Sequence, residues 1–300
     1  MTIPAHLRAS FPLIFVLIWS SGFIVARYGM PHAEPMTFLL IRFVLVLMLL
    51  IPIAFLLHRP WPPVALGLRI AIAGLLLQAG YLGGVWAAVR EGMTAGLVAL
   101  IMGLQPILTA AFLSLLRERI HPIQWLGLAM GLTGVGLVVA TKVSLTGLTT
   151  LSLGLSAIAL ASITIGTLYQ KRACPDFDLM TGMSIQFVAA ALVCLPFVFF
   201  VETRVINWHP EFVFSMAWSV LAISIGAISL LFVLIREGAA TNVTSLLYLT
   251  PPTTAAMAWV LFDEPITLIT LLGTLTTVVG VWLVTRTKPS KPGPAEEALQ

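Results

Sequence analysis

Long apolar stretches dominate this sequence, and each is long enough to cross a membrane. A transmembrane α-helix needs about 20 consecutive apolar residues, because the hydrocarbon core of a bilayer is about 30 Å thick. Ten such stretches follow one another, bounded by charges, prolines or glycines: residues 11–28, 36–57, 64–88, 94–116, 121–140, 150–170, 178–201, 210–235, 241–262 and 265–285. The loops between them are very short, so neighbouring helices are expected to be antiparallel. We therefore predict an all-α integral membrane protein of ten transmembrane helices.

The composition excludes the soluble classes. Hydrophobic residues make up 59% of the chain and charged residues only 9%, whereas soluble domains carry about 25% charged residues. The net charge of +4 is small, and the basic residues are scattered singly at helix ends. Nucleic-acid binding is not expected, because it needs a clustered basic face. The expected surroundings are the lipid bilayer, with a small-molecule substrate as the partner.

The basic residues also indicate how the chain is oriented. With the amino terminus inside the cell, eleven Lys and Arg lie at cytoplasmic helix ends and five at the other side. Arg42 counts among the five, although it lies a few residues inside its helix. Cytoplasmic loops carry the excess of Lys and Arg, so this distribution predicts that both termini are cytoplasmic. We expect a multi-pass protein of the inner (plasma) membrane.

An internal repeat divides the chain into two halves. Residues 88–142 align with 234–288 without a gap, at a constant offset of 146, and 18 of the 55 positions are identical. The identities include charged residues, glycines and a proline. We predict a first five-helix repeat at 1–145, a second at 146–288 and a disordered tail at 289–300. Because five is odd, the halves must be inverted in the membrane, a construction typical of secondary transporters with a site near the midplane.

Two motifs resemble a known family. The stretch "REGMTAGLVALIMGLQPILTAAFLSLLRERIHPIQWLGLAMGLTGVGLVV" at 90–139 resembles the EamA repeat of the drug/metabolite transporter superfamily. "PMTFLLIRFVL" at 35–45 is similar to the second helix of that family, with Arg42 where its arginine usually stands. The nearest likeness is to amino-acid exporters of the YddG type. This resemblance implies ten helices around a central cavity.

The ionisable residues argue against catalysis. All twelve Asp and Glu, and all five histidines, fall at helix ends, in loops or in the tails. No metal-ligand spacing and no nucleophile with a His and acid partner is found, so we predict no enzyme activity, no metal and no cofactor. A proton relay through a carboxylate at mid-span is not expected either. Downhill transport, or coupling through boundary groups such as Glu91 and Glu237, is left open.

Neutral polar and aromatic residues stand at the centres of the spans instead. Such groups are costly at bilayer depth unless they find partners, so we expect them in the bundle interior, either lining a cavity or hydrogen-bonding between helices. The predicted substrate-binding residues are Trp19, Ser20, Gln78, Tyr81, Gln105, Ser162, Gln186, Ser224, Tyr248 and Thr250. The second span has no polar residue at its centre and is expected to face lipid. A neutral cavity suits an uncharged or zwitterionic solute, whereas a dianion would need a buried Lys or Arg, which no span has at its centre.

Prolines and glycines indicate bends and close packing. Pro106, Pro251 and Pro252 interrupt the fourth and ninth spans and are predicted to bend two gating helices. Gly127 and Gly131 form a small-xxx-small pair in the fifth span, which predicts close packing either against the tenth span or across a dimer. The chain is therefore expected to be a monomer or a homodimer.

These features together predict a secondary transporter that exports small metabolites, amino acids foremost, by alternating access. An exporter of drugs or other neutral metabolites is the nearest alternative. A membrane-embedded enzyme acting on lipid-like substrates is a weaker one, because no catalytic cluster is found at either membrane face.

Overall fold

Helices make up most of the described chain. The computed structural model describes residues 5–105, 107–109, 112, 122–146, 148–174, 176–230 and 249–286, and no β-strand occurs among them. In chain order the elements, with η for π-helix, are α1 (Ala5–Gly29), α2 (Pro35–Leu56), α3 (Val64–Gly74), η1 (Leu75–Gly80), α4 (Tyr81–Arg90), α5 (Ala95–Met102), α7 (Pro122–Thr146), α8 (Thr150–Ala173), α9 (Leu179–Phe200), α10 (Pro210–Trp218), η2 (Ser219–Ala227), α13 (Thr250–Phe262) and α14 (Leu268–Arg286).

Six helical runs among the described residues are long and apolar enough to cross a membrane. They are Ser10–Gly29, Pro35–Leu56, Val64–Arg90, Thr150–Ala173, Leu179–Phe200 and Pro210–Leu230. Shorter apolar helices of 10–17 residues include Trp125–Val138 and Leu268–Leu283. The prediction of an all-α membrane protein is confirmed. The predicted tail at 289–300 lies outside the described residues.

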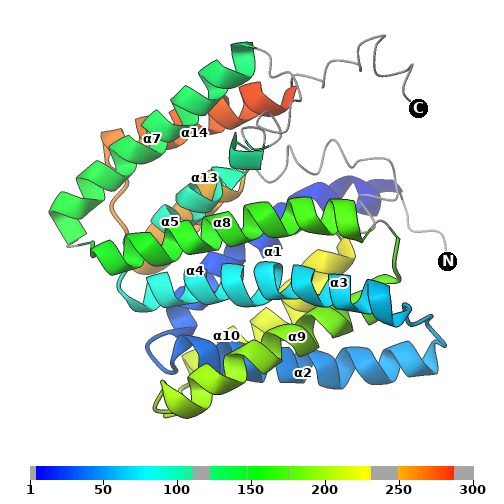
Figure 1. The fold of residues 1–300 in the computed structure, drawn as a ribbon. Helices are drawn as coiled ribbons and strands as arrows, with labels where there is room; N and C mark the ends of the chain where they lie inside the picture. Colours follow the sequence, from blue (N-terminus) through cyan, green and yellow to red (C-terminus); the bar gives the residue numbers. More distant parts are fainter. Residues whose placement is uncertain are drawn as a thin grey trace, which may run out of the picture.

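The helices lie side by side in a layered bundle (Figure 1). α7 pairs with α14 at one edge, α2 packs against α9 at the opposite edge, and α1, α5, α8 and α13 lie between them. The start of α1 and the end of α14 lie at the same end of the bundle, the right-hand end in Figure 1.

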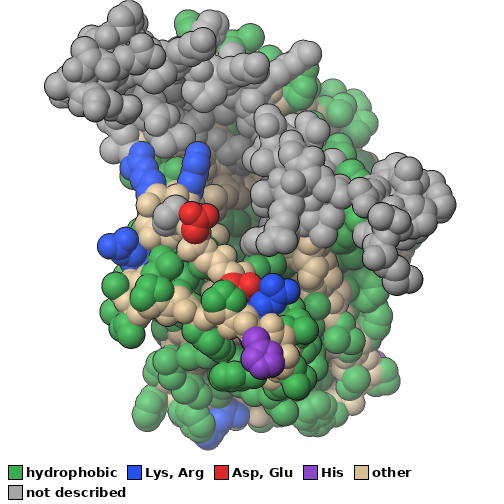
Figure 2. Space-filling model, turned by 90° about the vertical axis from the view of Figure 1, so that its right-hand side faces the viewer, with side chains coloured by type: hydrophobic (Ala, Val, Ile, Leu, Met, Phe, Trp, Pro, Cys, Tyr) green, Lys and Arg blue, Asp and Glu red, His purple; other side chains and the backbone are tan. Residues whose placement is uncertain are grey.

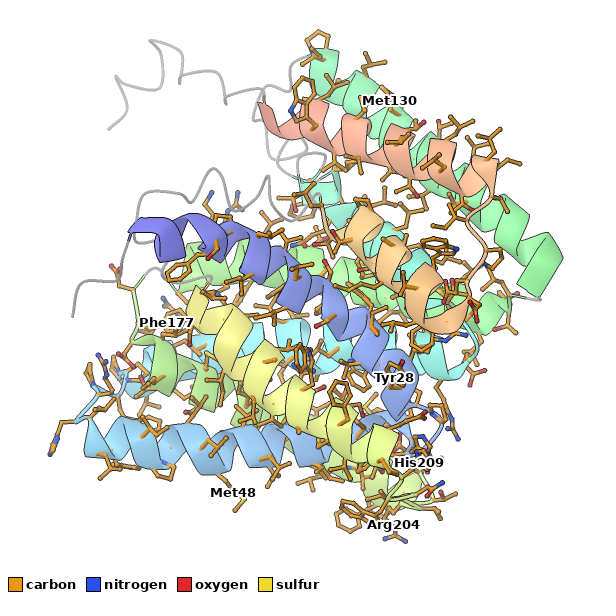
Figure 3. All side chains as sticks on the ribbon, turned by 180° about the vertical axis from the view of Figure 1, so that it is seen from behind. Tyr28, Met48, Met130, Phe177, Arg204 and His209 are labelled. Atoms are coloured by element: carbon orange, nitrogen blue, oxygen red, sulfur yellow. The ribbon has the colours of Figure 1, made fainter. Side chains whose placement is uncertain are left out.

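One face of α2 is buried, contrary to the prediction that this helix faces lipid. Phe38, Leu39 and Phe43 are completely buried in the core that α2 shares with its neighbours. Met48, labelled in Figure 3, and Leu56 are exposed by 66% and 76% on the lipid-accessible side. The prediction was wrong because it considered only the polarity at the centre of the helix. Apolar residues lie on both faces of α2, so the sequence does not indicate which face packs against the neighbouring helices.

Glycines bring α7 and α14 into backbone contact. A Cβ atom at Gly134 would lie 2.4 Å from the carbonyl oxygen of Gly273, and one at Gly280 would lie 2.5 Å from that of Gly127. Only residues without a side chain permit this approach. Of the two predicted arrangements, the structure therefore shows packing between the fifth and tenth spans of one chain.

Reciprocal carboxylates join the α1–α2 loop to the α9–α10 loop. Glu202 accepts hydrogen bonds from the backbone N–H groups of Met36 (2.8 Å) and Thr37 (2.7 Å) and from the Thr37 hydroxyl (2.7 Å). Glu34 in turn accepts from the backbone N–H (2.5 Å) and the hydroxyl (2.7 Å) of Thr203. Glu202 thus supplies the negative charge that stabilises the amino-terminal end of α2. We call these contacts, together with the histidine contacts described next, the loop clasp.

Histidines extend the loop clasp. His32 Nε2 lies 3.0 Å from a carboxylate oxygen of Glu211, and the His32 carbonyl accepts a 2.8 Å hydrogen bond from the Asn207 N–H. The ring of His209 stacks on that of His32, with the centroids 4.9 Å apart. Figure 3 places His209 and Arg204 at one end of the bundle and Phe177 at the other.

Candidate substrate site

Two π-helical segments interrupt the long spans in the bundle interior. η1 lies within the run Val64–Arg90, and η2 lies within the run Pro210–Leu230. π-Helical turns are rare and are often found at functional sites. Gln78 lies in η1 and Ser224 in η2, and their numbers differ by 146, the offset of the sequence repeat. Each of the two residues hydrogen-bonds to a polar side chain of another helix.

Gln78 begins a chain of three amides across η1, α9 and α8. Gln78 Nε2 donates to Gln186 Oε1 at 3.5 Å, and Gln186 Nε2 donates to Gln170 Oε1 at 2.7 Å. Gln186 is only 5% exposed, so its amide is held by these partners in the interior. Ser162 of α8 lies close to the same segment, because a Cβ at Gly80 would come within 2.7 Å of its Oγ.

Ser224 binds a buried charge. Nε and Nη2 of Arg42 donate to its Oγ at 3.1 and 3.0 Å, and both side chains are buried, with exposures of 4% and 0%. Tyr81, another predicted site residue, is the first residue of α4 and packs partly buried against the hydrophobic core. The sequence placed no Lys or Arg at the centre of a span, and it did not predict that Arg42, a few residues inside its helix, would be buried in the interior. Arg42 lies two turns inside α2, and its long side chain reaches η2.

Gln105 stands at a break in the fourth span. α5 ends at Met102, a turn follows, and helical structure resumes at Gln105. Gln105 Nε2 donates to the Thr167 hydroxyl of α8 at 3.0 Å, and Thr167 is exposed. An accessible polar pair within the membrane-spanning part of the chain is favourable where it faces water and costly where it faces lipid.

The described part of the ninth span begins at a turn. α13 begins at Thr250, directly after the turn residue Leu249. Pro251 and Pro252 lie in its first turn, where proline fits without distorting the helix. Pro251 packs on the break of the fourth span, since a Cβ at Gly103 would lie 2.9 Å from its Cγ. Pro106 and Tyr248 lie outside the described residues, and the bending role of the three prolines stays a prediction.

The remaining predicted residues of the described chain lie on α1 and α13, two helices that pack against each other. The Thr254 hydroxyl donates to the Ser20 carbonyl at 3.2 Å. Ser20 Oγ and Thr250 Oγ1 are both buried and have no hydrogen-bond partner in the described part of the chain. Trp19 is half-buried against Phe15, with ring centroids 5.5 Å apart.

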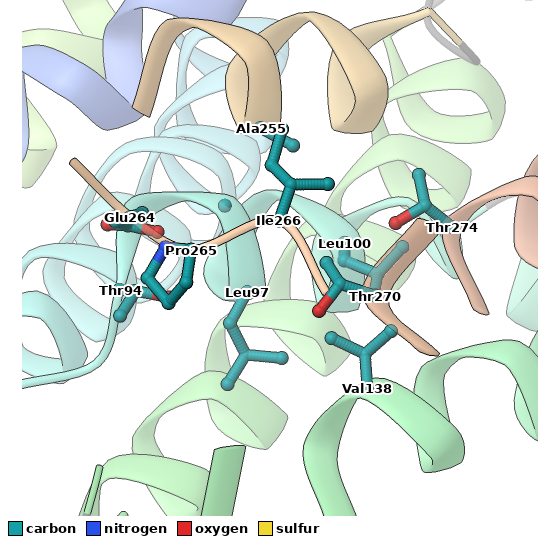
Figure 4. A pocket seen from close by; sticks show the side chains of 11 residues that line it. Thr94, Leu97, Leu100, Val138, Ala255, Glu264, Pro265, Ile266, Thr270 and Thr274 are labelled. Atoms are coloured by element: carbon teal, nitrogen blue, oxygen red, sulfur yellow. The ribbon is translucent and has the colours of Figure 1, made fainter. Parts of the chain in front are cut away.

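Two pockets lie at the end of the bundle that carries the loop clasp, and neither includes a predicted site residue. The first, between α5, α13, α14 and α7, has a volume of about 20 Å³ and is lined by Thr94, Leu97 and Glu264 among others (Figure 4). That is room for about one water molecule. The second measures about 290 Å³ and is lined by Arg27, Arg90 and neighbouring residues. Arg27 pairs with Glu264 at 2.6 Å beside it.

Sequence reasoning missed three polar residues that pair with the predicted site residues. Gln170 and Thr167 lie toward the end of α8 beside Lys171, where a polar residue reads as part of the helix end. In the sequence, Arg42 was counted among the basic residues that orient the chain in the membrane and was not predicted to be a site residue. Its signal was a charge inside an otherwise apolar span, which is functional by default in a membrane helix.

A bundle of membrane-crossing helices with polar side chains paired across its interior is the architecture of a transport protein. The comparison with protein families agrees, since the model of the EamA-like transporter family matches residues 9–140 and again 150–286. The chain belongs to the EamA-like transporter family. It is a multi-pass membrane transporter and not an enzyme, and the resemblance to the drug/metabolite transporter superfamily is confirmed.

Curated relatives align over nearly the whole chain. The "Uncharacterized inner membrane transporter YedA" of Escherichia coli K12 is 28% identical over 92% of this chain and 90% of its own length. The "Uncharacterized transporter YvbV" of Bacillus subtilis 168 is 27% identical, over 92% and 91%. A "Probable amino-acid metabolite efflux pump" of Escherichia coli K12 is 25% identical, over 90% and 92%.

The fold also matches a solved structure. A crystal structure covers 94% of this chain and 97% of its own, with a TM-score of 0.64 and 17% sequence identity. At that identity the match shows a shared fold alone.

Proposed function

We propose that this protein is a secondary transporter of the inner membrane that exports small metabolites, amino acids foremost, by alternating access. Its proposed architecture is ten transmembrane helices in two inverted repeats, 1–145 and 146–288, with both termini in the cytoplasm. The observation that carries the proposal is the pair of π-helical segments, each of which joins a polar residue to a polar partner inside the bundle.

Repeated contacts support the two inverted halves. Adding the sequence offset of 146 to Gly134 and Gly127 gives Gly280 and Gly273. The contact of Gly134 with Gly273 therefore has the contact of Gly280 with Gly127 as its counterpart. A two-fold axis in the membrane plane between α7 and α14 relates contacts in this way. The two successive matches to the family model favour the same division.

Charge supports the proposed orientation. Figure 2 looks at the end of the bundle where α1 begins, and Lys and Arg side chains stand out on it among few acidic ones. Arg59, whose Nη1 lies 3.7 Å from a carboxylate oxygen of Asp178, belongs to the α2–α3 loop, which the proposed topology also places in the cytoplasm. An excess of basic residues marks the cytoplasmic side. The loop clasp then lies on the outer face.

The polar interior supports a zwitterionic solute. The amides of Gln78, Gln170 and Gln186 offer both acceptors and donors, and Arg42 offers positive charge. An α-amino acid presents an ammonium group and a carboxylate to such a surface. A relative named as an amino-acid metabolite efflux pump agrees with this substrate class.

Flux through liposomes tests the proposal. Purified protein is reconstituted, the liposomes are loaded with a panel of labelled amino acids, and efflux is followed with and without an imposed pH gradient. We expect efflux of at least one amino acid above that of empty liposomes, and loss of most of it in Gln186→Leu. No flux for any amino acid from well-folded protein would refute amino-acid export, and flux of other neutral metabolites or drugs alone would favour the alternative exporter. Faster efflux in the presence of the pH gradient would identify proton coupling. Light scattering of the purified protein would distinguish a monomer from a homodimer.

A further inference from the structure

Arg42 is a charge buried within the membrane-spanning part of the molecule. It is 4% exposed, and its helix, α2, is apolar on either side of it. Placing an arginine near the centre of a bilayer costs about 2.5–3.5 kcal/mol on insertion scales, and such residues usually pair with a carboxylate. No carboxylate forms an ion pair with Arg42 in the part of the chain that the structure describes.

The guanidinium has hydrogen-bonding capacity to spare. It carries five N–H donors. The Nε–H and one N–H of Nη2 both go to the single oxygen of Ser224. Three N–H groups, including both on Nη1, donate to no group among the described residues. A planar edge of two nitrogens with free N–H groups is the geometry that binds a carboxylate with two parallel hydrogen bonds.

A purely structural link between α2 and η2 would not need this residue. A neutral amide could donate to the Ser224 hydroxyl at a much smaller cost of burial. Ser224 holds the Nε side of the guanidinium, and both Nη1 donors make no hydrogen bond to any residue that the structure describes.

We propose that Arg42, oriented by Ser224, binds the carboxylate of the transported solute, so that the protein selects substrates that carry a single carboxylate. The proposal deepens the proposed function and rests on it for the transport step. The bound carboxylate neutralises a charge that is otherwise left without a counterion in the described structure. An amino acid then places its ammonium group toward neutral acceptors such as Gln78.

Paired ligands that differ only in charge test the proposal in the wild-type protein. The panel contains amino acids and their carboxamides, and simple monocarboxylates and their amides. Each is measured by the thermal shift of the purified protein and by counterflow in liposomes. We expect acids to be preferred over the matching amides by at least about tenfold. Equal stabilisation and equal transport of acid and amide would overturn the proposal, whatever any variant does.

Variants then assign the preference to Arg42. In Arg42→Gln we expect the preference of acid over amide to fall to about twofold or less, and Arg42→Lys, a point charge without the fork, should keep part of it. Arg69→Gln, which removes an exposed charge of α3, serves as the control and should keep the wild-type preference. A folded Arg42→Gln that retains the full preference would overturn the assignment. If Arg42→Gln does not fold, Ser224→Ala takes its place. A folded Ser224→Ala variant that keeps the full preference of acid over amide would then overturn the assignment.

The outcomes for this proposal and for the proposed function are separable. If monocarboxylates are bound and moved in preference to their amides but no amino acid is, the role of Arg42 stands and amino-acid export fails. If amino acids and their amides are moved equally, export stands and the role of Arg42 fails.

Discussion

Single carboxylates determine how the two loops of the clasp are held. Burial raises the pKa of Glu34, but the hydrogen bonds from Thr203 and the charge of Arg90 outweigh it, so that the pKa lies below its ordinary value of 4.5. A carboxylate whose pKa is lower in the folded than in the unfolded state contributes stability above its unfolded pKa. That contribution is lost as the pH falls through the folded value.

Glu34→Gln should therefore flatten the acid side of the stability profile. The midpoint of thermal unfolding is measured in detergent between about pH 3 and pH 7. We expect the variant to be less stable than the wild type near neutrality and to approach it below the folded pKa. Glu91→Gln removes an exposed carboxylate at the end of α4 and serves as the control. A constant difference between Glu34→Gln and the wild type at every pH would contradict the argument.

Gln105 offers a second test with one residue. Its amide bonds to the exposed Thr167 hydroxyl, so its removal buries no unpaired group. Gln105→Ala should leave the unfolding temperature within a few degrees of the wild type. We expect it to lower flux at low substrate concentration by about three- to tenfold, the worth of one hydrogen bond. Wild-type flux and selectivity in this variant would remove Gln105 from the site.

The sequence indicated which polar residues lie in the interior better than it indicated which of them contact each other. Gln78, Gln186 and Ser224 could be assigned to the interior because amides and hydroxyls avoid hydrocarbon. Their partners Gln170 and Arg42 could not, since the reach of a long side chain from a helix end depends on packing that hydropathy does not encode. The Gln78–Gln186 contact spans 108 positions in the chain.

At the scale of helices, the positions of the six long spans among the described residues followed directly from the sequence. The predicted span 36–57 corresponds to α2 at Pro35–Leu56, because apolar length alone defines a membrane helix. The π-helical segments could not be foreseen in this way. A shift from α to π changes only the register of backbone hydrogen bonds and leaves the hydropathy of the span unchanged.

The α7–α14 pair gives a prediction at this scale. Gly134→Leu should lower the unfolding temperature by several degrees, because its Cβ would overlap backbone atoms of α14 and overpacking costs about 1–3 kcal/mol or more. Gly280→Leu, its counterpart at the offset of 146, should have a similar effect. Gly136→Leu on the same helix is the control, since a Cβ there would have no atom of another described helix within 4 Å. Equal tolerance of all three substitutions would refute close packing of this pair.

At the scale of the whole molecule, alternating access requires the end with the loop clasp to open. The contacts there join the two proposed halves: Glu34 and Thr37 belong to the first, and Glu202 and Thr203 to the second. Arg27 and Glu264 form another such link. In the proposed export cycle these bonds break each time the outer face opens, and their strength limits how often it opens.

Weakening one of these links should increase opening. Glu264→Gln removes the partner of Arg27, an ion pair of which Glu264 is 11% and Arg27 36% exposed. A pair with this exposure is worth at most about 1 kcal/mol, which corresponds to a two- to fivefold change in the open population. The reporter is the completely buried Ser20, changed to cysteine in a background without the two native cysteines, both of which are buried.

The rate at which a membrane-impermeant thiol reagent, added outside the cell, labels Ser20→Cys measures that opening. We expect labelling to be two- to fivefold faster with Glu264→Gln than without it. Arg59→Gln, which loosens the contact with Asp178 at the opposite end, should not accelerate labelling from outside. Equal rates for Glu264→Gln and its parent would show that the Arg27–Glu264 pair does not hold the outer face closed. Faster labelling in both variants would mean that removing either charge loosens the bundle generally. The contacts between the two halves would then not be the gate.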